Sequence, residues 1–216
     1  DFVGDQRADV FYSDGQAWYI SDGGVGMFAA FVNRQGSGFR VADLGFGDFN
    51  GDGKTDVVGV VGGQWKVSFN ATQPWANPPL RPALTGTMAG LMIADFNADG
   101  LADIATAELG YLPSGKSVTP FWNWKVSWAG KGGWTPLRTV YAPPVGVGRF
   151  DATRGADILV WESTSSSTIS ILSSGVGAPI RYRSTNNRTP SESASLMARI
   201  AVICEPMWKW RHTSRS

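Results

Sequence analysis

The chain has 216 residues and a formal net charge of only +1, with no lysine or arginine run before its tail, so nucleic-acid binding through a basic face has little support. Its longest apolar runs are strand-sized, which predicts no membrane span, and its single cysteine excludes a disulfide within the chain. Alternating apolar residues punctuated by 27 glycines favour short strands over helices. No signal peptide is visible, and the first residue already lies in a motif. We therefore expect the sequence to begin at a processing or cloning boundary.

One nine-residue segment recurs four times along the chain. The copies, which we call loops 1 to 4, are DFVGDQRAD from Asp1, DFNGDGKTD from Asp48, DFNADGLAD from Asp95 and RFDATRGAD from Arg149. Their starts lie 47, 47 and 54 residues apart, and a β-rich run such as VVGVV follows each of them. Of the 14 aspartates, 11 fall within these loops, so the segments carry a shared chemistry that turns elsewhere in the chain lack.

A second segment recurs between the loops and has an aromatic residue at each end. It reads WYISDGGVGMF, WKVSFNATQPW and WKVSWAGKGGW in successive repeats. Apolar and polar residues alternate in the second copy, which is the period of a half-buried strand. We expect the opening aromatic residues to pack between sheets and the closing ones to cap the same core; these are Trp18, Trp65 and Trp124, then Phe28, Trp75 and Trp134.

The period of the repeat predicts an all-β fold. A further strand leads into loop 2 (FRVADLGFG) and into loop 3 (AGLMIA), so each repeat of about 47 residues holds three or four short strands. This is the size of one β-propeller blade, and blades packed face to face bury both sides of each sheet. We expect a β-propeller of four-stranded antiparallel blades, with four to five blades in this chain. A solenoid is the alternative at this period.

Loops 2 and 3 place oxygen-bearing side chains at their first, third, fifth and ninth positions. Hard oxygen donors at alternate residues of a tight loop suit calcium. The predicted ligands of loop 2 are Asp48, Asn50, Asp52, Asp56 and the backbone carbonyl of Lys54. Those of loop 3 are Asp95, Asn97, Asp99, Asp103 and the carbonyl of Leu101. An EF-hand is excluded because its twelfth position requires glutamate. Plain surface turns are the alternative, and two near-identical copies in register favour the metal.

Loops 1 and 4 keep fewer of these donors. Loop 1 retains Asp1, Asp5 and Asp9, but a valine replaces the third-position donor and Gln6 replaces the turn glycine, so calcium binding there stays open. Loop 4 begins with Arg149, has Thr153 at its fifth position, and retains only Asp151 and Asp157. We predict no metal in loop 4, because Arg149 would supply a fixed positive charge where the cation would lie.

The segments GFGDFNGDGKTDVVGV (45–60) and IADFNADGLADIATA (93–107) resemble the FG-GAP or VCBS repeats of integrin α-chain propellers and of secreted microbial proteins. Weaker matches around loops 1 and 4 extend the resemblance over residues 1–180. The resemblance implies a secreted, calcium-stabilised β-propeller, commonly with seven blades, so that this chain would hold a truncated propeller. Some members of the family bind carbohydrate and others mediate protein adhesion. Phe46 and Gly47 match the start of the family name, but no Gly-Ala-Pro segment is present.

The residues give little support for catalysis. His212 is the only histidine, only four glutamates occur, and no G-x-S-x-G elbow is present. We therefore expect a non-catalytic binding module, with carbohydrate as the leading ligand class. Tyr111, Trp122 and Trp128 lie in or beside an insertion of the third repeat and are the candidate ligand-binding residues. The alternative is an extracellular structural or adhesion subunit with a protein partner. Open blade edges would also favour self-association.

The segment from residue 181 to residue 216 departs from the repeat. A fifth loop is expected near residue 196, but that region reads LMARIAVICE and has no aspartate. Two explanations stay open. The tail is either a degenerate fifth blade, with RIAVIC and MWKWR as strands, or a frameshifted segment, because a shifted reading frame permits an Asn-Gly-x-x-x-x-Asp-Leu pattern there.

Overall fold

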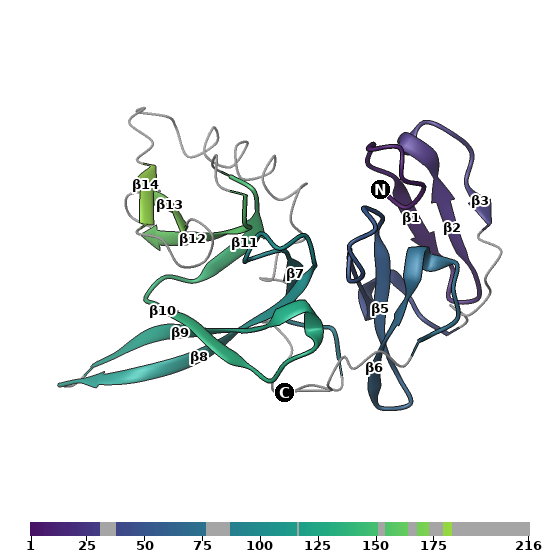
Figure 1. The fold of residues 1–216 in the computed structure, drawn as a ribbon. Coiled ribbons are helices and arrows are strands. Elements are labelled where there is room, and N and C mark those ends of the chain that lie inside the picture. Colours follow the sequence, from purple (N-terminus) through teal and green to yellow (C-terminus); the bar gives the residue numbers. More distant parts are fainter. Residues whose placement is uncertain are drawn as a thin grey trace, which may run out of the picture. The chain divides into compact units, whose positions relative to one another are not determined.

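The computed structural model describes residues 1–30, 38–76, 87–115, 117–150, 154–163, 168–172 and 179–182. These residues form four sheets and several short 3-10 turns, with no α-helix among them (Figure 1). The chain divides into two compact units. Unit 1 contains Asp1–Ala105 and Val126–Thr135, and unit 2 contains Thr106–Lys125 and the chain from Pro136 onward. The predicted all-β class is confirmed.

Each sheet is built from strands that follow one another in the sequence. Sheet 1 contains β1 (Val10–Ser13), β2 (Trp18–Ser21) and β3 (Ala29–Ala30). Sheet 2 contains β4 (Leu44–Gly47), β5 (Asp56–Val61) and β6 (Gln64–Ser68). Sheet 3 contains β7 (Leu91–Ala94), β8 (Asp103–Ser114), β9 (Ser117–Ser127) and β10 (Thr135–Val140). Sheet 4 contains β11 (Pro144–Gly148), β12 (Asp157–Ser163), β13 (Thr168–Leu172) and β14 (Pro179–Tyr182).

The acidic loops connect paired strands at equivalent places. Gly47 at the end of β4 lies opposite Asp56 at the start of β5, so loop 2 closes an antiparallel hairpin. Gly148 and Asp157 are paired in the same way in sheet 4, across loop 4. In loops 2, 3 and 4 the ninth position is therefore also the first residue of a strand, and in loop 1 Asp9 directly precedes β1, which explains why a β-rich run follows each loop.

A 3-10 turn follows the second strand of three repeats. These turns are η1 (Asp22–Gly24), η4 (Phe69–Ala71) and η5 (Trp128–Gly130); a fourth turn, η3 (Val41–Asp43), precedes β4. The strand before each of the three repeated turns ends in a buried serine, whose hydroxyl donates to a backbone carbonyl five residues later. These bonds give the three turns a common shape.

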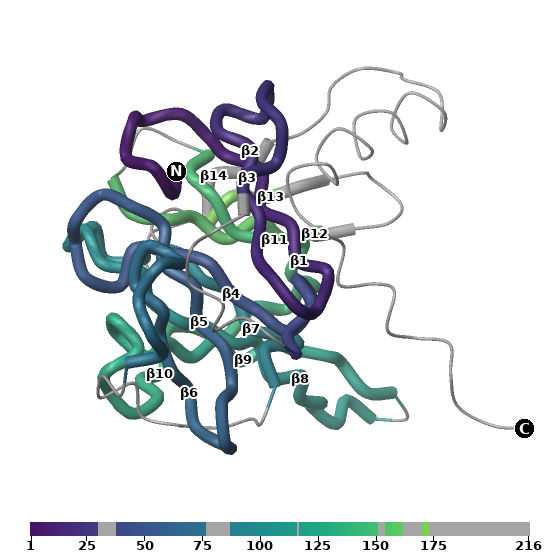
Figure 2. Tube along the Cα trace, turned by 90° about the vertical axis from the view of Figure 1, so that its right-hand side faces the viewer, coloured from purple at the N-terminus to yellow at the C-terminus, as the bar shows by residue number. Residues whose placement is uncertain are grey.

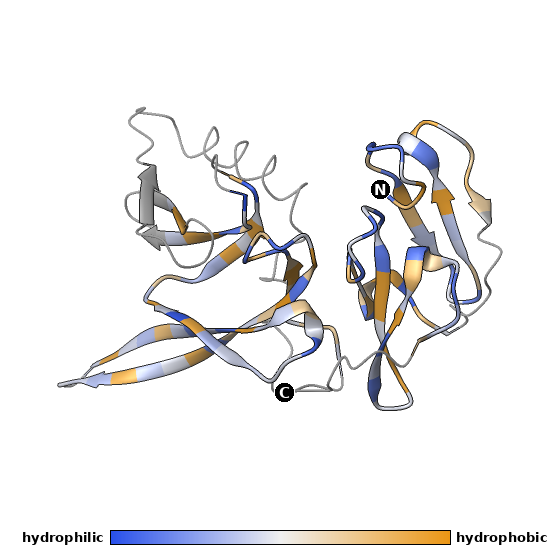
Figure 3. Ribbon diagram, in the orientation of Figure 1, coloured by the Kyte–Doolittle hydropathy of each residue, from blue (hydrophilic) through white to orange (hydrophobic). Residues whose placement is uncertain are grey.

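In unit 1 the middle sheet is buried on both faces. Val57 belongs to a core cluster with Trp18 and Ile20 of sheet 1, whereas its neighbour Val58 belongs to a second cluster that includes Ile104 of sheet 3. Successive side chains of a strand point to opposite faces, so β5 contributes to both clusters. Figure 3 shows hydrophobic residues concentrated on such strands and hydrophilic residues on the loops before them. Face-to-face packing of this kind is what the repeat pattern predicts.

Two glycines of β4 allow the close approach of β7, which lies beside it (Figure 2). A Cβ atom added to Gly47 would lie 2.6 Å from Ala102 Cβ and 2.8 Å from Ile93 Cγ2. A Cβ atom added to Gly45 would lie 2.6 Å from the Met88 side chain. No side chain fits at such distances without displacement. The Gly-Phe-Gly sequence before loop 2 is therefore a packing requirement.

The predicted core aromatic residues are confirmed in part. Trp18, Trp65 and Trp124 are buried, and Trp75 and Trp134 pack against the two core clusters. The prediction for Phe28 is wrong, because half of that residue is exposed and its ring contacts Tyr12 instead. Phe28 lies between η1 and β3, and its ring packs on Tyr12 of β1 at the surface of sheet 1, outside both core clusters.

Two other expectations concern regions that the structure covers in part. β14 extends to Tyr182, and the remainder of the predicted atypical tail, including any fifth loop, lies outside the described residues. Four separate sheets are present, but how many blades a closed ring would have stays a prediction. Among the residues that the structure describes, no helix has both the length and the apolar character needed to cross a membrane.

Candidate metal-binding loops

Loop 2 is wrapped around its first aspartate. Asp48 Oδ1 accepts the backbone N–H of Gly51 at 2.6 Å, and Asp48 Oδ2 accepts that of Gly53 at 2.8 Å. Asp52 accepts the N–H of Lys54 at 2.9 Å and the side-chain amide of Asn50 at 3.1 Å. These bonds turn the carboxylates toward the inside of the loop. The oxygen donors predicted from the sequence therefore belong to one hydrogen-bonded turn.

Loop 3 repeats this arrangement. Asp95 Oδ2 accepts the N–H of Gly100 at 3.0 Å, and Asp99 accepts the N–H of Leu101 at 2.8 Å and the amide of Asn97 at 3.0 Å. Lys54 and Leu101 each donate a backbone N–H to an aspartate of the loop, whereas the predicted metal ligands are their backbone carbonyls. The assignment of those two carbonyls stays a prediction.

The sixth position of each loop takes a left-handed backbone conformation. Gly53 has φ of 80° and Gly100 has φ of 87°, a region that glycine adopts without strain. Gln6 takes the same conformation in loop 1, with φ of 67°. A side chain is disfavoured there, so loop 1 has a backbone cost at its sixth position that loops 2 and 3 avoid, while loop 3 has a comparable left-handed residue at its fourth position, Ala98, with φ of 63°.

The ninth aspartate of loops 1 to 3 joins two segments of its repeat. Asp56 Oδ2 accepts the N–H of Phe49, and its Oδ1 accepts the N–H of Asn70 in η4, each at 2.8 Å. Asp103 makes the same pair of bonds with Phe96 and with Ala129 in η5. Asp9 accepts the N–H groups of Phe2 and Gly23 in sheet 1. The ninth position therefore has a structural role that the sequence analysis did not recognise.

Burial of these carboxylates has a clear electrostatic consequence. Asp56 and Asp103 are fully buried, and burial raises the pKa of each to about 6. The backbone N–H bonds oppose this rise in pKa, while the charges of Asp48 and Asp52 add to it for Asp56. Asp9 is only half-buried; burial raises its pKa, but bonds from Gly23 and Phe2 outweigh that effect and leave it below its usual value.

Successive loops are hydrogen-bonded to each other. The N–H of Thr55 donates to the carbonyl of Asp1, and the N–H of Ala102 donates to the carbonyl of Asp48, both at 2.6 Å. The side chain of Leu101 also lies against Gly51 of the preceding loop. In unit 1 the three acidic loops thus form a continuous row, in which the eighth residue of one loop bonds to the first residue of the loop before it.

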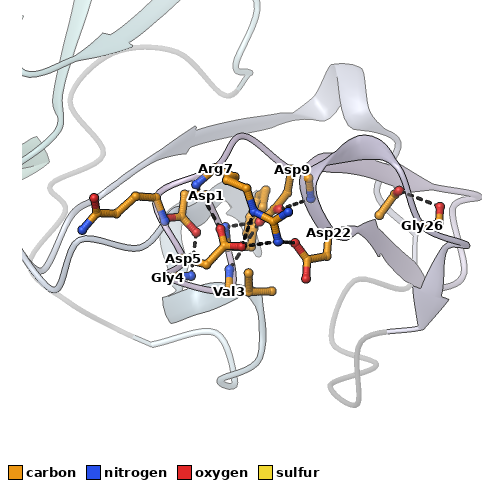
Figure 4. Close-up of polar contacts among 12 residues, drawn as sticks. Asp1, Val3, Gly4, Asp5, Arg7, Asp9, Asp22 and Gly26 are labelled. Carbon is orange, nitrogen blue, oxygen red and sulfur yellow. Dashed lines mark hydrogen bonds and ion pairs between the residues drawn. The ribbon is translucent and has the colours of Figure 1, made fainter.

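Loop 1 differs from its neighbours because it contains an arginine (Figure 4). Asp5, Asp9 and Asp22 can each place a carboxylate oxygen within 4.8 Å of the others; among the described residues no other three acidic side chains do so, those of loops 2 and 3 included. The Arg7 side chain donates to Asp5 Oδ2 through Nε at 2.6 Å and to Asp22 Oδ1 through Nη2 at 3.0 Å. Its guanidinium lowers the pKa of Asp5. A positive charge is therefore already present, and loop 1 fits calcium less well than loops 2 and 3.

Loop 4 lies partly outside the described residues. Arg149 is exposed, and Asp157 is buried and accepts the N–H of Phe150 at 2.7 Å. Asp151 and Thr153 fall in the part that the structure does not describe. The expectation that loop 4 binds no metal stays a prediction.

The three candidate ligand-binding aromatic residues occupy different environments. Tyr111 lies in the outer half of β8 and is 57% exposed. Trp122 lies in β9, the other strand of the same hairpin, and is half-buried. Trp128 opens η5 and is also half-buried. Tyr111 and Trp122 therefore share one hairpin, and Tyr111 is the more accessible of the two.

The donor set of loops 2 and 3 fits calcium. Each loop combines three carboxylates with one amide side chain, all hard oxygen donors, and Asn50 and Asn97 hydrogen-bond to the aspartates that would share the ion. In each loop the ninth carboxylate is fully buried, and burial together with the charges of the other two aspartates opposes its ionisation. A divalent cation would neutralise that charge.

Residues 48–106 match the family model described as an FG-GAP-like repeat. The chain contains an FG-GAP-like repeat. The match spans loops 2 and 3 together with the strands between them, as the resemblance predicted, and is consistent with the FG-GAP repeat β-propeller family. No curated protein and no solved structure gives a significant match to the chain.

Sequence reasoning missed three residues near the loops. Asp22 lies outside the nine-residue segments and was therefore not predicted as a metal ligand, yet η1 brings its carboxylate close to those of Asp5 and Asp9. Arg7 and Asn70 were also not considered as parts of these sites. The available signal was the repeated 3-10 turn, since ISDGG, VSFNA and VSWAG hold the same place in three repeats. That alignment places Gly23, Asn70 and Ala129 at one equivalent position beside loops 1, 2 and 3 respectively, and Asp22 directly precedes Gly23.

Proposed function

We propose that this chain is a non-catalytic, calcium-stabilised β-propeller binding module that acts outside the cell and binds carbohydrate. The proposal is carried by the row of loops in unit 1. Loops 2 and 3 hold equivalent oxygen donors in the same register, and one backbone hydrogen bond links them. Calcium bound there would screen the clustered carboxylates and hold the hairpins together without disulfides.

The proposed extracellular location is the setting in which weak calcium sites would be filled. Calcium sites of extracellular modules commonly have dissociation constants of about 10⁻⁴ to 10⁻³ M. Such sites would be filled outside cells and nearly empty in cytosol. At a calcium concentration 100 times the Kd, one site adds about 2.7 kcal/mol to the free energy of unfolding. Calcium would then act as a structural ion.

The β8–β9 hairpin supports carbohydrate as the ligand class. Tyr111 exposes an aromatic face, and Trp122 lies on the adjoining strand. Aromatic faces stack on the C–H surfaces of sugars, and long hairpins that extend from a rigid scaffold commonly carry ligand contacts. A non-catalytic role is supported by the buried aspartates, because both oxygens of Asp56 and of Asp103 already accept backbone N–H groups.

An adhesion or structural subunit is the second candidate, and one surface favours it. The turn between β2 and β3 exposes Val25 by 87%, Met27 by 94% and Phe28 by 50%. Adjacent exposed apolar side chains are typical of surfaces that bind a protein partner. A second copy of this chain is one such partner.

A glycan array measured in millimolar calcium and again with excess chelator tests the leading proposal. We expect calcium-dependent binding to a defined set of glycans, weakened by Tyr111→Ala and unchanged by Tyr141→Ala, which alters another exposed tyrosine. The absence of glycan binding in calcium would contradict the carbohydrate proposal. Native mass spectrometry of the same sample would then test the second candidate, through a stable complex with itself or with a protein partner.

A further inference from the structure

One polar atom beside loop 2 is buried without a partner. Asn70 lies in η4, and its Oδ1 atom is buried and accepts no hydrogen bond. Its backbone N–H donates to Asp56, and its side-chain amide bonds to the carboxylate of Asp52. A buried oxygen with no donor is costly, because it has given up its bonds to water. Some interaction must therefore compensate for the burial of Asn70 Oδ1 at this position.

The immediate neighbours of Asn70 are candidate calcium ligands. Its side-chain nitrogen and oxygen are attached to the same carbon, so Oδ1 lies close to the Asp52 carboxylate that the nitrogen contacts. A half-turn of the amide exchanges the two atoms. Facing a bare carboxylate, the nitrogen is favoured, whereas facing a cation held by that carboxylate, the oxygen is favoured.

We propose that Asn70 Oδ1 is an additional oxygen ligand of a calcium site in loop 2, supplied from outside the nine-residue loop. This inference rests on the proposed function, in which loop 2 binds calcium. It assigns to η4 the role of completing the coordination shell. The loop alone supplies only five of the predicted oxygen donors. Calcium accepts six to eight oxygens, so further donors are needed.

The chain provides its own control for this proposal. Ala129 holds the equivalent place beside loop 3, since its N–H donates to Asp103 as that of Asn70 donates to Asp56. The two residues also share a left-handed backbone, with φ of 48° for Ala129 and 53° for Asn70. Alanine and asparagine are thus both tolerated at this place. Loop 3 has no side-chain oxygen there, so the proposal predicts that loop 2 binds calcium more tightly than loop 3.

The test measures calcium binding to each loop separately by isothermal titration calorimetry. Asp99→Asn disables loop 3 and leaves loop 2, and Asp52→Asn disables loop 2 and leaves loop 3. In the first background we expect Asn70→Ala to weaken calcium binding roughly tenfold. In the second we expect Ala129→Asn to strengthen it by a similar factor. Thermal unfolding in chelator checks that each variant folds.

A structural role for Asn70 makes a different prediction. Asparagine tolerates left-handed backbone better than most residues, so it could serve the turn alone. In that case Asn70→Gly, which keeps the turn and removes the oxygen, will leave the calcium Kd of loop 2 within twofold of its original value. That result, or an Ala129→Asn variant without tighter binding, would overturn the proposal while leaving calcium binding itself intact. A wild-type chain that binds no calcium would overturn both.

Discussion

Replacing Asp103 by alanine separates the structural role of the loop from any metal role. In chelator the variant leaves the N–H groups of Phe96 and Ala129 without an acceptor. Each unsatisfied buried donor costs about 1–3 kcal/mol, so the two together cost about 2–6 kcal/mol. The substitution also removes a buried carboxylate whose ionisation opposes folding, and this offsets part of the loss at neutral pH.

The sign of the pH dependence follows from the raised pKa. Burial raises the pKa of Asp103 to about 6 from its ordinary value of 3.8. The folded chain therefore binds this proton more tightly than the unfolded chain, so its contribution to stability is fully present below about pH 4 and is lost as the pH rises through about 6. The full loss is about 3 kcal/mol, of which about 1 kcal/mol falls between pH 5 and pH 7. We expect Asp103→Ala to destabilise the protein by about 1 kcal/mol more at pH 5 than at pH 7.

Urea unfolding followed by tryptophan fluorescence measures this difference, in excess chelator at both pH values. Asp99→Ala is the matched control, because Asp99 is exposed and bonds only within loop 3. We expect it to cost less than about 1 kcal/mol at either pH. If Asp103→Ala costs no more than this control at pH 5, the assigned role of its hydrogen bonds is wrong. If it costs more at pH 7 than at pH 5, the assigned rise in the pKa of Asp103 is wrong.

Three further expectations follow from the structure. Gly47→Val should destabilise the protein by roughly 1–3 kcal/mol through overpacking against β7, whereas Gly63→Val, in an open turn, should show only the cost of its left-handed backbone; urea unfolding compares them. Calcium should raise the midpoint of thermal unfolding, measured by differential scanning calorimetry, and this rise should vanish in the Asp52→Asn, Asp99→Asn double variant. Arg7→Gln should cost less than about 1 kcal/mol in chelator, since its ion pairs are exposed, and should add a calcium-dependent rise in the melting temperature that a calcium titration would detect.

The sequence predicted the fold well because its signals are local and repeated. Alternation within WKVS and the spacing of the loops indicated short strands in units of about 47 residues, and β5, β6 and the last residues of β9 lie where they were expected. β9 begins earlier, at Ser117, because the insertion of the third repeat lengthens the β8–β9 hairpin. The exposed position of Phe28 could not be predicted in this way. Trp75 holds the same place before a single bridging residue, Ala76, and still packs against a core cluster, so burial of a closing aromatic residue depends on the neighbouring side chains that it meets in the fold.

The loops were located correctly, but their hydrogen bonds could not be predicted from spacing. A carboxylate at the ninth position looks the same in sequence whether it faces a cation or two backbone N–H groups. The bond from Asn70 to Asp56 joins residues 14 positions apart, and that from Ala129 to Asp103 spans 26. Long hairpins bring these pairs together, so their proximity is a property of the folded sheet and cannot be read from the motif.

Comparison of the four loops distinguishes the residues that the hairpin requires from the residues that would bind a metal. Loop 4 begins with Arg149 in place of an acidic residue, yet it keeps Asp157, which is buried and accepts the N–H of Phe150 as Asp56 accepts that of Phe49. The ninth aspartate therefore persists where the first-position donor is lost, because the hairpin needs an acceptor at that place. It follows that the ninth aspartate alone is weak support for calcium. The argument for a metal depends on the first, third and fifth positions, which only loops 2 and 3 fill with oxygen donors throughout.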